Sequence, residues 1–500
     1  MGKTQNAEEP PVRKKGKKAS VKKKIAKNNA SSKTPRALAS NEPAFRLQRG
    51  TSSYGVEPLG NLLFEAPVSN VRDVGLGNLW SLTDELLLDI LGLLDAKDLG
   101  RLAVVSRAFY VVVHQDSLWR NLVLEEFKGN FSFTGRWKNS YIATRYPQFA
   151  GPAHVPLKIR NFYSDYFFQS WLCASLELTK DWLIRDNIER RSNLSVEEFV
   201  KDFEEPNKPV LITGALDHWP ALAKWDREYL LKHAGEVSFA AGPVDLKLKD
   251  YYSYADLVEE ERPLYIFDSK FAEKCPQLAL DYDVPKYFRE DLFSLLGSAR
   301  PDYRWLISGP ARSGSSFHID PNSTSAWNAV IRGAKKWVMY PPHVVPPGVH
   351  PSPDGAEVAS PVSLTEWFMN FYEQTRWQKE KPVECVCRAG EVVFVPNGWW
   401  HIVINLEESI AITQNYVSRS NLLNVLEFLS KPNSKELVSG TTDRVSLFDR
   451  FKSKFEEQFP GSIADMQRAA DERRKMLQQK SSFWDSVADT KAGVFKFGFT

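Results

Sequence analysis

The sequence predicts a multidomain α+β protein, in which a small helical unit precedes a barrel or sandwich of antiparallel strands. A chain of 500 residues and 57.0 kDa is too long for one small module. Between Leu79 and about Phe127, apolar residues recur every three or four positions, as they do along amphipathic helices. From Tyr303 to about Val417, short runs rich in β-branched and aromatic residues alternate with glycine and proline turns. Many short strands at this spacing are typical of antiparallel sandwiches and barrels.

Three short helices are expected in the first unit. Residues 82–94 carry leucine and isoleucine at three- and four-residue steps, and Ser81 with Asp84 has the spacing of an N-terminal capping box. Residues 99–113 make a second amphipathic helix, and Asp116 opens a third. Such a short bundle has a small core of its own, so a surplus apolar face is expected to take a partner.

The second unit begins near Leu194, where the pattern becomes α/β-like. Ser195 starts a helix, and Pro209–Thr213 is expected to be a short buried strand. The strands expected further along the chain are residues 304–307, 326–331, 336–340, 391–395, 401–406 and 410–413. The region beyond Leu422 is helical in pattern, with one apolar face. That face consists of Ile463, Met466, Ala470 and Leu477.

The net charge of +3 conceals an uneven distribution. Residues 1–40 hold 12 basic and two acidic residues, whereas the remaining 460 residues hold 53 basic and 60 acidic ones. The four cysteines, of which only Cys385 and Cys387 are close together, cannot form a disulfide framework or a four-thiolate zinc site. No run approaches about 18 uncharged apolar residues, so no membrane span is expected. The lysine-rich amino terminus lacks the apolar core of a secretory signal.

The basic tail predicts a nuclear protein. Two lysine and arginine clusters within residues 13–24 are nearly free of large apolar groups, so this segment has too little apolar surface to fold. Paired clusters of this kind suit a nuclear-import receptor. Nucleic-acid phosphates are an alternative partner, and a solvated tail without a partner is the third reading. Residues 41–75 are expected to be a linker.

His318-Ile-Asp320 pairs a histidine with a carboxylate two residues later. On a strand, side chains two residues apart point the same way, so both can reach one metal ion. His401, which follows the turn Pro396–Trp400 and opens a strand, is the best candidate for a third ligand. Two histidines and one carboxylate form the facial triad of non-haem Fe(II) oxygenases, which leaves positions open for a cosubstrate and dioxygen. The alternative is a surface aspartate beside a histidine that is hydrogen-bonded within the core.

Lys335 shares a strand face with two large apolar residues, Trp337 and Met339. A lysine in such a place is unusual unless it reaches solvent or meets an anion. The distal carboxylate of 2-oxoglutarate is such an anion, and breaking a buried ion pair from one side typically costs ~3–5 kcal/mol. Three further polar residues in apolar surroundings can bond to this cosubstrate or are satisfied within the core: Tyr265, Asn328 and Thr413.

Residues 82–91, 99–110 and Leu118-Trp119 together resemble an F-box. That family docks on a Skp-type adaptor of cullin–RING ubiquitin ligases, so the resemblance implies an adaptor-binding surface within residues 79–122. Thr83 stands where many members have proline, and a threonine also serves at a helix start. The alternative is an ordinary helical bundle that belongs to the next domain.

A second resemblance covers residues 194–429. Its motifs are His318-Ile-Asp-Pro321, Thr324-Ser-Ala-Trp-Asn328, Lys335-Lys-Trp337, Phe394–His401 and Ile410–Asn415. Together they resemble a Jumonji C (JmjC) domain, nearest to the phosphatidylserine-receptor subgroup of lysyl hydroxylases and arginine demethylases. The resemblance implies a double-stranded β-helix of the jelly-roll or cupin type, with flanking helices.

The JmjC resemblance also implies site residues. His318, Asp320 and His401 would bind Fe(II), and Lys335 with Thr413 would hold the distal carboxylate of 2-oxoglutarate. The same pocket would be lined by Asn328, Tyr265 and Ser315, the last in place of a threonine in the subgroup. The proline-rich residues 341–382 differ from the subgroup and are expected to rim the active site.

Five segments are therefore expected: a disordered basic tail and linker (1–75), an F-box (76–127), a helical connector (128–193), a JmjC domain (194–435, barrel core about 303–417) and a C-terminal helical segment (436–500). The sequence predicts that the protein is an Fe(II)- and 2-oxoglutarate-dependent oxygenase. Its predicted location is the nucleus, with the cytoplasm as a second location. It would hydroxylate or demethylate lysine or arginine side chains of basic nuclear proteins. The alternative is a ubiquitin-ligase substrate receptor that uses the barrel for binding. The C-terminal helices either pack on the barrel or pair two subunits as a homodimer.

Overall fold

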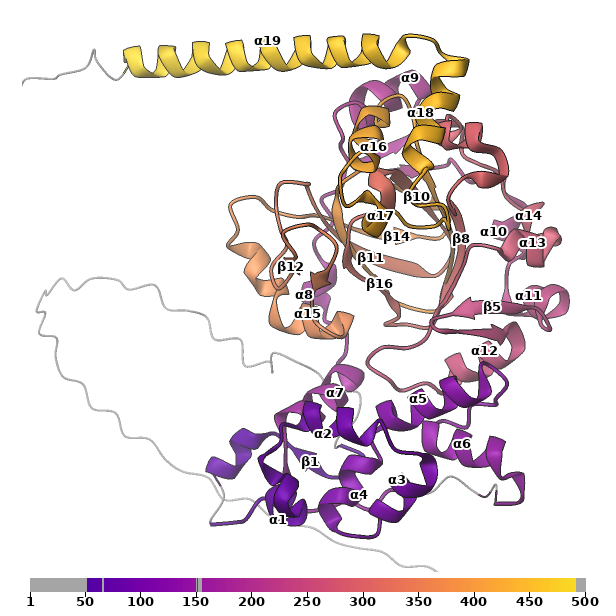
Figure 1. Ribbon diagram of the computed structural model, residues 1–500, viewed down its shortest axis with the longest axis vertical. Helices are drawn as coiled ribbons and strands as arrows, with labels where there is room; N and C mark the ends of the chain where they lie inside the picture. The colour runs from indigo at the N-terminus through magenta and orange to yellow at the C-terminus, as the bar shows by residue number, and fades with distance from the viewer. Residues whose placement is uncertain (1–51, 65–66, 150, 152–154, 492–500) are drawn as a thin grey trace, which may run out of the picture. The chain divides into compact units, whose positions relative to one another are not determined.

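The structure is a computed structural model that describes residues 52–64, 67–149, 151 and 155–491, with side chains described as far as residue 476 (Figure 1). The basic clusters at 13–24, with their predicted import and nucleic-acid contacts, lie outside the described residues. The side chain of Leu477, the last residue of the predicted apolar face, lies outside them too. Within the described part of the chain, no helix is both long and apolar enough to cross a membrane.

The F-box unit contains four helices where the sequence predicts three. They are α2 (Asp84–Leu91), α3 (Ala96–Leu102), α4 (Arg107–Val113) and α5 (Asp116–Phe127). The predicted helix over 99–113 is broken because Ser106 is extended, and its hydroxyl accepts the backbone N–H of Phe109 at 3.1 Å. This hydroxyl therefore caps a new helix, as serine commonly does outside a helix interior.

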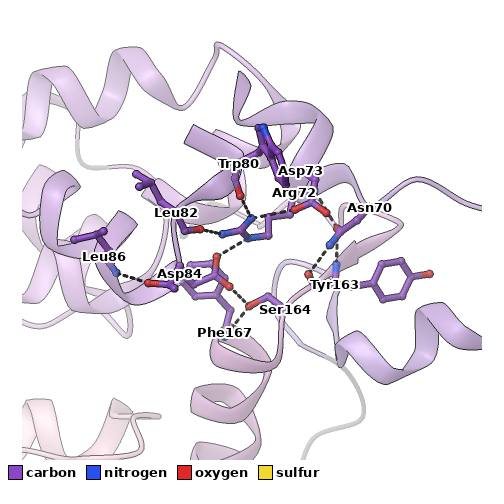
Figure 2. Close-up of polar contacts among 11 residues, drawn as sticks. Asn70, Arg72, Asp73, Trp80, Leu82, Asp84, Leu86, Tyr163, Ser164 and Phe167 are labelled. Carbon is purple, nitrogen blue, oxygen red and sulfur yellow. Dashed lines mark hydrogen bonds and ion pairs between the residues drawn. The ribbon is translucent and has the colours of Figure 1, made fainter. Parts of the chain in front are cut away.

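A buried arginine fixes the start of α2, and the predicted Ser81–Asp84 capping box is wrong. Thr83 is the N-cap, and its hydroxyl accepts a backbone N–H of the first turn. Asp84 pairs instead with Arg72, whose Nε lies 2.6 Å from Oδ1 (Figure 2). The hydroxyl of Ser164 donates to the other oxygen of Asp84 at 2.5 Å. This network ties the F-box helix to the connector, 80 residues further along the chain.

Residues 52–75, predicted as linker, instead contain short elements that pack on the F-box. These are β1 (Val56–Glu57), η1 (Leu59–Leu63) and α1 (Val71–Gly75), followed by η2 (Gly77–Ser81). Strand β1 pairs in parallel with β2 (Phe162–Tyr163) of the connector. The connector also holds α6 (Trp137–Arg145), η3 (Pro147–Phe149), α7 (Asp165–Ser175) and α8 (Lys180–Leu183). Elements this short leave no helical or strand period in the sequence, so the pattern missed them.

The predicted fold class is confirmed, because two β-sheets form a double-stranded β-helix. The core of the larger sheet has the order β15 (Glu391–Val395), β10 (Ser325–Arg332), β17 (Ser409–Tyr416), β8 (Arg304–Gly309). The smaller sheet has the order β14 (Val383–Arg388), β11 (Ala334–Tyr340), β16 (Trp400–Asn405), β9 (Gly314–His318). Five outer strands extend the larger sheet to nine: β3 (Arg190–Ser192), β4 (Val210–Thr213), β5 (Ser238–Ala241), β6 (Val244–Lys247) and β7 (Ile266–Asp268).

All six strands predicted in the barrel, and the short strand at 209–213, are present. The other two barrel strands, β9 and β14, were not predicted with bounds, although a strand was expected at His318–Asp320 and a strand-like segment at Cys385–Cys387. The sequence of β9 is Gly-Ser-Ser-Phe-His, which lacks the apolar run that marks a strand. Asp320 lies beyond the end of β9, at the start of the short helix η7 (Pro321–Ser323), so the expectation that it shares a strand with His318 is wrong.

The two faces of the smaller sheet have different neighbours. Trp337 and Met339 of β11 face inward, where they pack against residues of the larger sheet such as Val330. Val338 and Tyr340 of the same strand face outward, where α15 (Leu364–Asn370) covers them. Consecutive residues on this strand therefore enter different environments, the barrel interior and an outer layer.

Helices flank both ends of the barrel. Ahead of it, α9 (Val196–Phe199) begins at the predicted Ser195, with a capping box completed by Glu198. It is followed by η4 (Val200–Glu204), α10 (Pro220–Lys224), α11 (Arg227–Ala234), α12 (Leu248–Leu257), α13 (Phe271–Lys274), α14 (Pro276–Ala279), η5 (Lys286–Phe288) and η6 (Leu292–Ala299). Between barrel strands lie β12 (His350–Pro351), β13 (Val358–Ala359), α15 (Leu364–Asn370) and η8 (Tyr372–Arg376). The C-terminal helices are α16 (Leu422–Leu429), α17 (Ser434–Leu437), α18 (Leu447–Gln458) and α19 (Ser462–Lys491).

The C-terminal helices pack on η6 through a separate apolar cluster that includes Phe293, Val425 and Phe451. Ile463 at the start of α19 is buried in this cluster, and Met466 is packed against it. The remainder of α19 extends away from these helices (Figure 1). The first turn of the predicted apolar face therefore packs within the chain.

Candidate functional site

Two histidines and one aspartate meet at one end of the barrel. His318 ends β9 and His401 is the second residue of β16, and the two residues are directly paired across these antiparallel strands. Their ring centroids lie 4.1 Å apart. Asp320 joins them from the loop after β9, and one ligand atom from each residue lies within 4.8 Å of the others. This spacing suits three ligands around a single metal ion.

The hydrogen bonds of the cluster leave the inward-facing atoms open. Nδ1 of His318 lies 2.8 Å from the carbonyl oxygen of Ser316, and Nδ1 of His401 lies 3.0 Å from that of Trp399. Such bonds orient an imidazole and leave its Nε2 without a proton, ready to bind a metal. Oδ2 of Asp320 is buried and has no hydrogen-bond partner among the residues that the structure describes. A buried carboxylate oxygen that lacks a donor is costly, and a cation would satisfy it.

Burial shifts two of the three ligands toward their neutral forms. It lowers the pKa of His401 well below the ordinary value, and the nearby His318 acts in the same direction. Burial raises the pKa of Asp320, although the charge of His318 and a hydrogen bond from Asn415 oppose that shift. A histidine that stays neutral is the form that binds metals. A cation held between the three residues would compensate the charge of the aspartate.

Lys335 projects into the barrel interior from β11. It is 2% exposed, and its Nζ donates to Oδ1 of Asn405 on β16 at 2.7 Å. An amide oxygen carries no charge, so burial lowers the pKa of Lys335 to about 8. Among the described residues, no carboxylate forms an ion pair with this lysine. The arrangement provides a buried cation that would be stabilised by an anion.

Two of the other predicted residues face the same interior from the larger sheet. Asn328 of β10 and Thr413 of β17 are directly paired across the strands. The Thr413 hydroxyl donates to the carbonyl of Trp327 at 2.9 Å, which leaves its oxygen able to accept. Oδ1 of Asn328 and Nε1 of Trp337 are both buried, and neither atom has a hydrogen-bond partner in the described part of the chain. With the orphaned oxygen of Asp320, these atoms mark the interior as a site for a polar ligand.

Tyr265 and Ser315 lie together at the edge of this interior. Their hydroxyl oxygens are 2.7 Å apart, and Ser315 is paired with Val403 across β9 and β16. Ser315 is also three residues before His318 on the same strand. Burial raises the pKa of Tyr265, so this hydroxyl keeps its proton at neutral pH and can donate.

A cleft of about 790 Å³ opens at His318. Tyr265 and Ser315 also line it, whereas Asp320, His401 and Lys335 do not. Val358, Ser360 and Val362 form part of its rim, as expected for the proline-rich stretch 341–382. Helix α5 of the F-box forms another part of the cleft. The cleft therefore reaches one member of the triad, His318, from the surface.

Three residues of this site were not singled out from the sequence. Asn405 accepts the hydrogen bond of Lys335, Asn415 donates to Asp320, and Trp337 stacks on His401 with ring centroids 5.7 Å apart. Asn405 and Asn415 were readable only as polar residues inside apolar runs, a signal that a buried amide leaves in any β-protein. Their partners are set by strand pairing between segments far apart in sequence.

A double-stranded β-helix with two histidines and an aspartate at its mouth defines the metal-dependent oxygenase class of cupin folds. Residues 196–421 match a family described as a cupin-like domain, and residues 79–125 match the F-box-like family. The chain belongs to the JmjC family of iron- and 2-oxoglutarate-dependent oxygenases, and it carries an F-box ahead of the catalytic domain. The predicted family, enzyme class and cofactors are thereby confirmed.

Among curated relatives, the chain is 63% identical to arginine-specific demethylase JMJ22 of Arabidopsis thaliana, over 91% of this chain and 90% of that protein. It is 38% identical to lysine-specific demethylase JMJ21 of the same plant, over 70% of this chain and 38% of that protein. The bifunctional arginine demethylase and lysyl-hydroxylase psr-1 of Caenorhabditis elegans is 45% identical, over 48% of this chain and 63% of that protein. The first relative therefore shares both the F-box region and the barrel.

Proposed function

We propose that His318, Asp320 and His401 hold Fe(II) and that this centre oxidises arginine side chains of proteins. The observation that carries the proposal is the cluster itself. Three ligand atoms lie within 4.8 Å, both imidazoles have Nδ1 at a carbonyl, and one carboxylate oxygen is buried without a partner. Three protein ligands leave the remaining positions of an octahedral ion open, which suits a chelating cosubstrate and dioxygen.

The barrel interior would hold 2-oxoglutarate. Lys335 would pair with its distal carboxylate, and Thr413 and Asn328 face the same interior with open acceptor oxygens. Tyr265 and Ser315 would contact it from the side of the cleft. When bound, iron and 2-oxoglutarate supply the oxidation of a substrate C–H bond by dioxygen, with succinate and CO2 as coproducts. The surrounding residues orient both groups and keep water out of the interior.

Removal of an N-methyl group from arginine is the favoured reaction. The relative that aligns with nearly the whole chain is named an arginine-specific demethylase, and psr-1 is named both an arginine demethylase and a lysyl hydroxylase. Oxidation of an N-methyl carbon gives a hemiaminal that loses formaldehyde, whereas oxidation within a side chain gives a stable alcohol. Lysyl hydroxylation is the second candidate activity.

The experiment is mass spectrometry of methylated arginine peptides and matched lysine peptides after incubation with Fe(II), 2-oxoglutarate and the purified protein. Loss of a methyl group with release of formaldehyde is expected, and His318→Ala should abolish it together with succinate formation. Addition of one oxygen to the lysine peptide would favour hydroxylation. Succinate formation that survives in His318→Ala would contradict the oxygenase centre.

We also propose that the F-box binds a Skp-type adaptor. The F-box match covers residues 79–125; α2 presents Leu86 and Ile90 on an exposed face, and Leu93 lies exposed in the turn that follows the helix. Leu93 is 86% exposed, a high value for a leucine in a folded unit. Leu86→Asp should abolish adaptor binding in a pull-down with purified adaptor and leave turnover intact. Adaptor binding that is unaffected by Leu86→Asp would contradict this surface.

We propose nuclear localisation through the basic clusters at 13–24, with substrates among nuclear proteins. Support comes from the sequence, in which two lysine-rich clusters precede an otherwise mildly acidic chain. Replacing Arg13 and the lysines of residues 13–24 by glutamine should shift a fluorescent fusion from the nucleus to the cytoplasm. A fusion that remains nuclear would contradict the assignment. Nucleic-acid binding by the same segment would instead appear as strongly salt-dependent affinity.

A further inference from the structure

The cleft at His318 is built by two domains. One part of its lining comes from β9 and the segment before β7, in the JmjC domain. Another part comes from Arg120, Asn121 and Leu124 on α5, the last helix of the F-box match. Asn121 is exposed in this cleft, whereas Leu124 is buried beneath it. A polypeptide that reaches His318 through the cleft therefore passes along an F-box helix.

The two domains share an apolar interface that holds α5 in place. A single apolar cluster includes Leu87 of α2, Trp119 of α5 and Ile412 of the barrel. Phe133, just after α5, lies against Tyr254 of α12 with ring centroids 5.0 Å apart. A shared core of this kind acts as one packed unit and not as two domains on a flexible hinge.

Polar contacts reinforce this interface between the two domains. The indole of Trp137 donates to Glu260, whose other oxygen lies 3.6 Å from Nε of Arg120. At Gly129, φ is +92°, and a Cβ there would lie 1.9 Å from the carbonyl oxygen of Asp245. The chain after α5 thus approaches strand β6 so closely that only glycine fits. These contacts fix the distance between α5 and the catalytic barrel.

The cleft presents an arginine to incoming substrate. Arg262 lines it, is exposed, and makes no hydrogen bond or close ion pair with any described residue. The neighbouring Glu261 also lines the cleft, and its carboxylate accepts the hydroxyl of Ser170 at 2.8 Å. The exposed guanidinium of Arg262 is therefore available to a carboxylate, and its planar shape favours bidentate pairing.

We propose that the substrate polypeptide binds in this interdomain cleft, with α5 of the F-box as one wall and with Arg262 paired to an acidic side chain close to the oxidised residue. The inference rests on the proposed oxygenase function and names the substrate class, a segment with a carboxylate beside its target. It assigns the F-box two faces. Leu86 and Ile90 of α2 are exposed for an adaptor, while Asn121 of α5 contacts substrate.

The wall is tested by Asn121→Trp, which narrows the cleft from the F-box side. Glu125→Trp is the matched control, because Glu125 is also exposed on the same helix and does not line the cleft. The probe is a short fluorescent peptide with a central monomethylarginine and a glutamate on either side, and the readout is anisotropy with metal-free protein. Asn121→Trp should raise the Kd for the peptide at least ~tenfold. Glu125→Trp should bind the peptide with the same Kd as the unaltered protein.

The charge is tested with a second peptide in which glutamines replace the glutamates. The unaltered protein should prefer the acidic peptide by roughly two- to fivefold, as for an exposed charge pair, and Arg262→Gln should remove the preference. Equal binding by Asn121→Trp and the unaltered protein, no binding of either peptide, or a preference for glutamine would each overturn the inference. Failure of the proposed function itself is distinguishable, because the unaltered protein would then form no succinate.

Discussion

Lys335 and Lys336 are adjacent on β11, and both are buried, at 2% and 0% exposed. Lys336 faces outward and lies 2.8 Å from a carboxylate oxygen of Glu384, which is itself 0% exposed. Lys335 faces inward, and among the described residues its Nζ has the amide oxygen of Asn405 as its one hydrogen-bond partner. The first lysine has a permanent countercharge and belongs to the fold. The second lacks one, and this marks the interior as a ligand site.

The environment of Lys336 explains why its charge is tolerated. Its Nζ also donates to the carbonyl of Arg185 at 2.6 Å. Glu384 accepts further hydrogen bonds from the guanidinium of Arg185 at 3.1 Å and from the hydroxyl of Tyr372 at 2.8 Å. Every oxygen of the carboxylate is thereby satisfied, the condition under which a buried ion pair is stable.

Breaking the outward pair should have the largest effect on stability. Lys336→Met leaves Glu384 buried with one cation fewer, which should lower the free energy of unfolding by ~3–5 kcal/mol. Chemical denaturation of the full chain, followed by tryptophan fluorescence, measures this change. The matched variant Lys335→Met removes a neighbouring buried lysine and serves as the control. A Lys336→Met protein as stable as its parent would show that the two lysines do not differ.

The inward lysine should show the opposite pattern. Lys335→Met removes a charge with no countercharge, so the free energy of unfolding should be unchanged or higher. Its affinity for 2-oxoglutarate should fall by ~10²–10³, because the carboxylate loses its buried partner. Calorimetric titration of the protein with 2-oxoglutarate gives the second quantity. Retained affinity for 2-oxoglutarate would remove Lys335 from the site.

A smaller effect concerns pH. Because burial lowers the pKa of Lys335 to about 8, the free protein loses this proton as pH rises above that value. Pairing with a carboxylate needs the charged form, so affinity for 2-oxoglutarate should fall by up to ~tenfold per pH unit above pH 8. Titrations between pH 7 and 9.5 would show the slope, and Lys335→Met should lack it. A flat profile in the parent would contradict a paired Lys335.

The same shift has a consequence for the ligand-free protein. The pKa of Lys335 is lower in the folded state than its ordinary value of 10.5, so the unfolded chain binds more protons between about pH 8 and that value. Through this group, the free energy of unfolding rises with pH across that window. Below about pH 8, Lys335 is charged in both states, and the folded state carries the full cost of burying the charge. The difference between parent and Lys335→Met in denaturation experiments isolates the contribution.

The inward lysine was predictable from the sequence, and the outward one was not. Alternation along 335–339 places Lys335 on the face of Trp337 and Met339, and a charge among large apolar residues indicates a ligand. The same alternation says nothing of Lys336, because its partner Glu384 arrives on β14 through strand pairing. Spacing within one strand is local information, whereas the identity of a cross-strand partner depends on the tertiary fold.

The triad shows a related limit. His318, Asp320 and His401 were correctly selected as a group that the fold brings together, yet the expected geometry of Asp320 was wrong. The strand ends at His318, and the aspartate returns to the cluster from the following turn, where Asn322 has φ of +58°. Turn conformations that depend on such residues leave no periodic signal. The cleft at α5 could not be predicted from the sequence either, because it forms where two domains pack against each other.

The most direct test of the inward site is an anaerobic titration of the full chain with Fe(II) and 2-oxoglutarate, monitored in the visible region for the metal-to-ligand charge-transfer band, with His401→Ala measured in parallel. The parent should develop the band, and His401→Ala should lack it while remaining folded, as circular dichroism would verify. A folded parent without the band, or a band that persists in His401→Ala, would contradict a metal and cosubstrate site made by these residues.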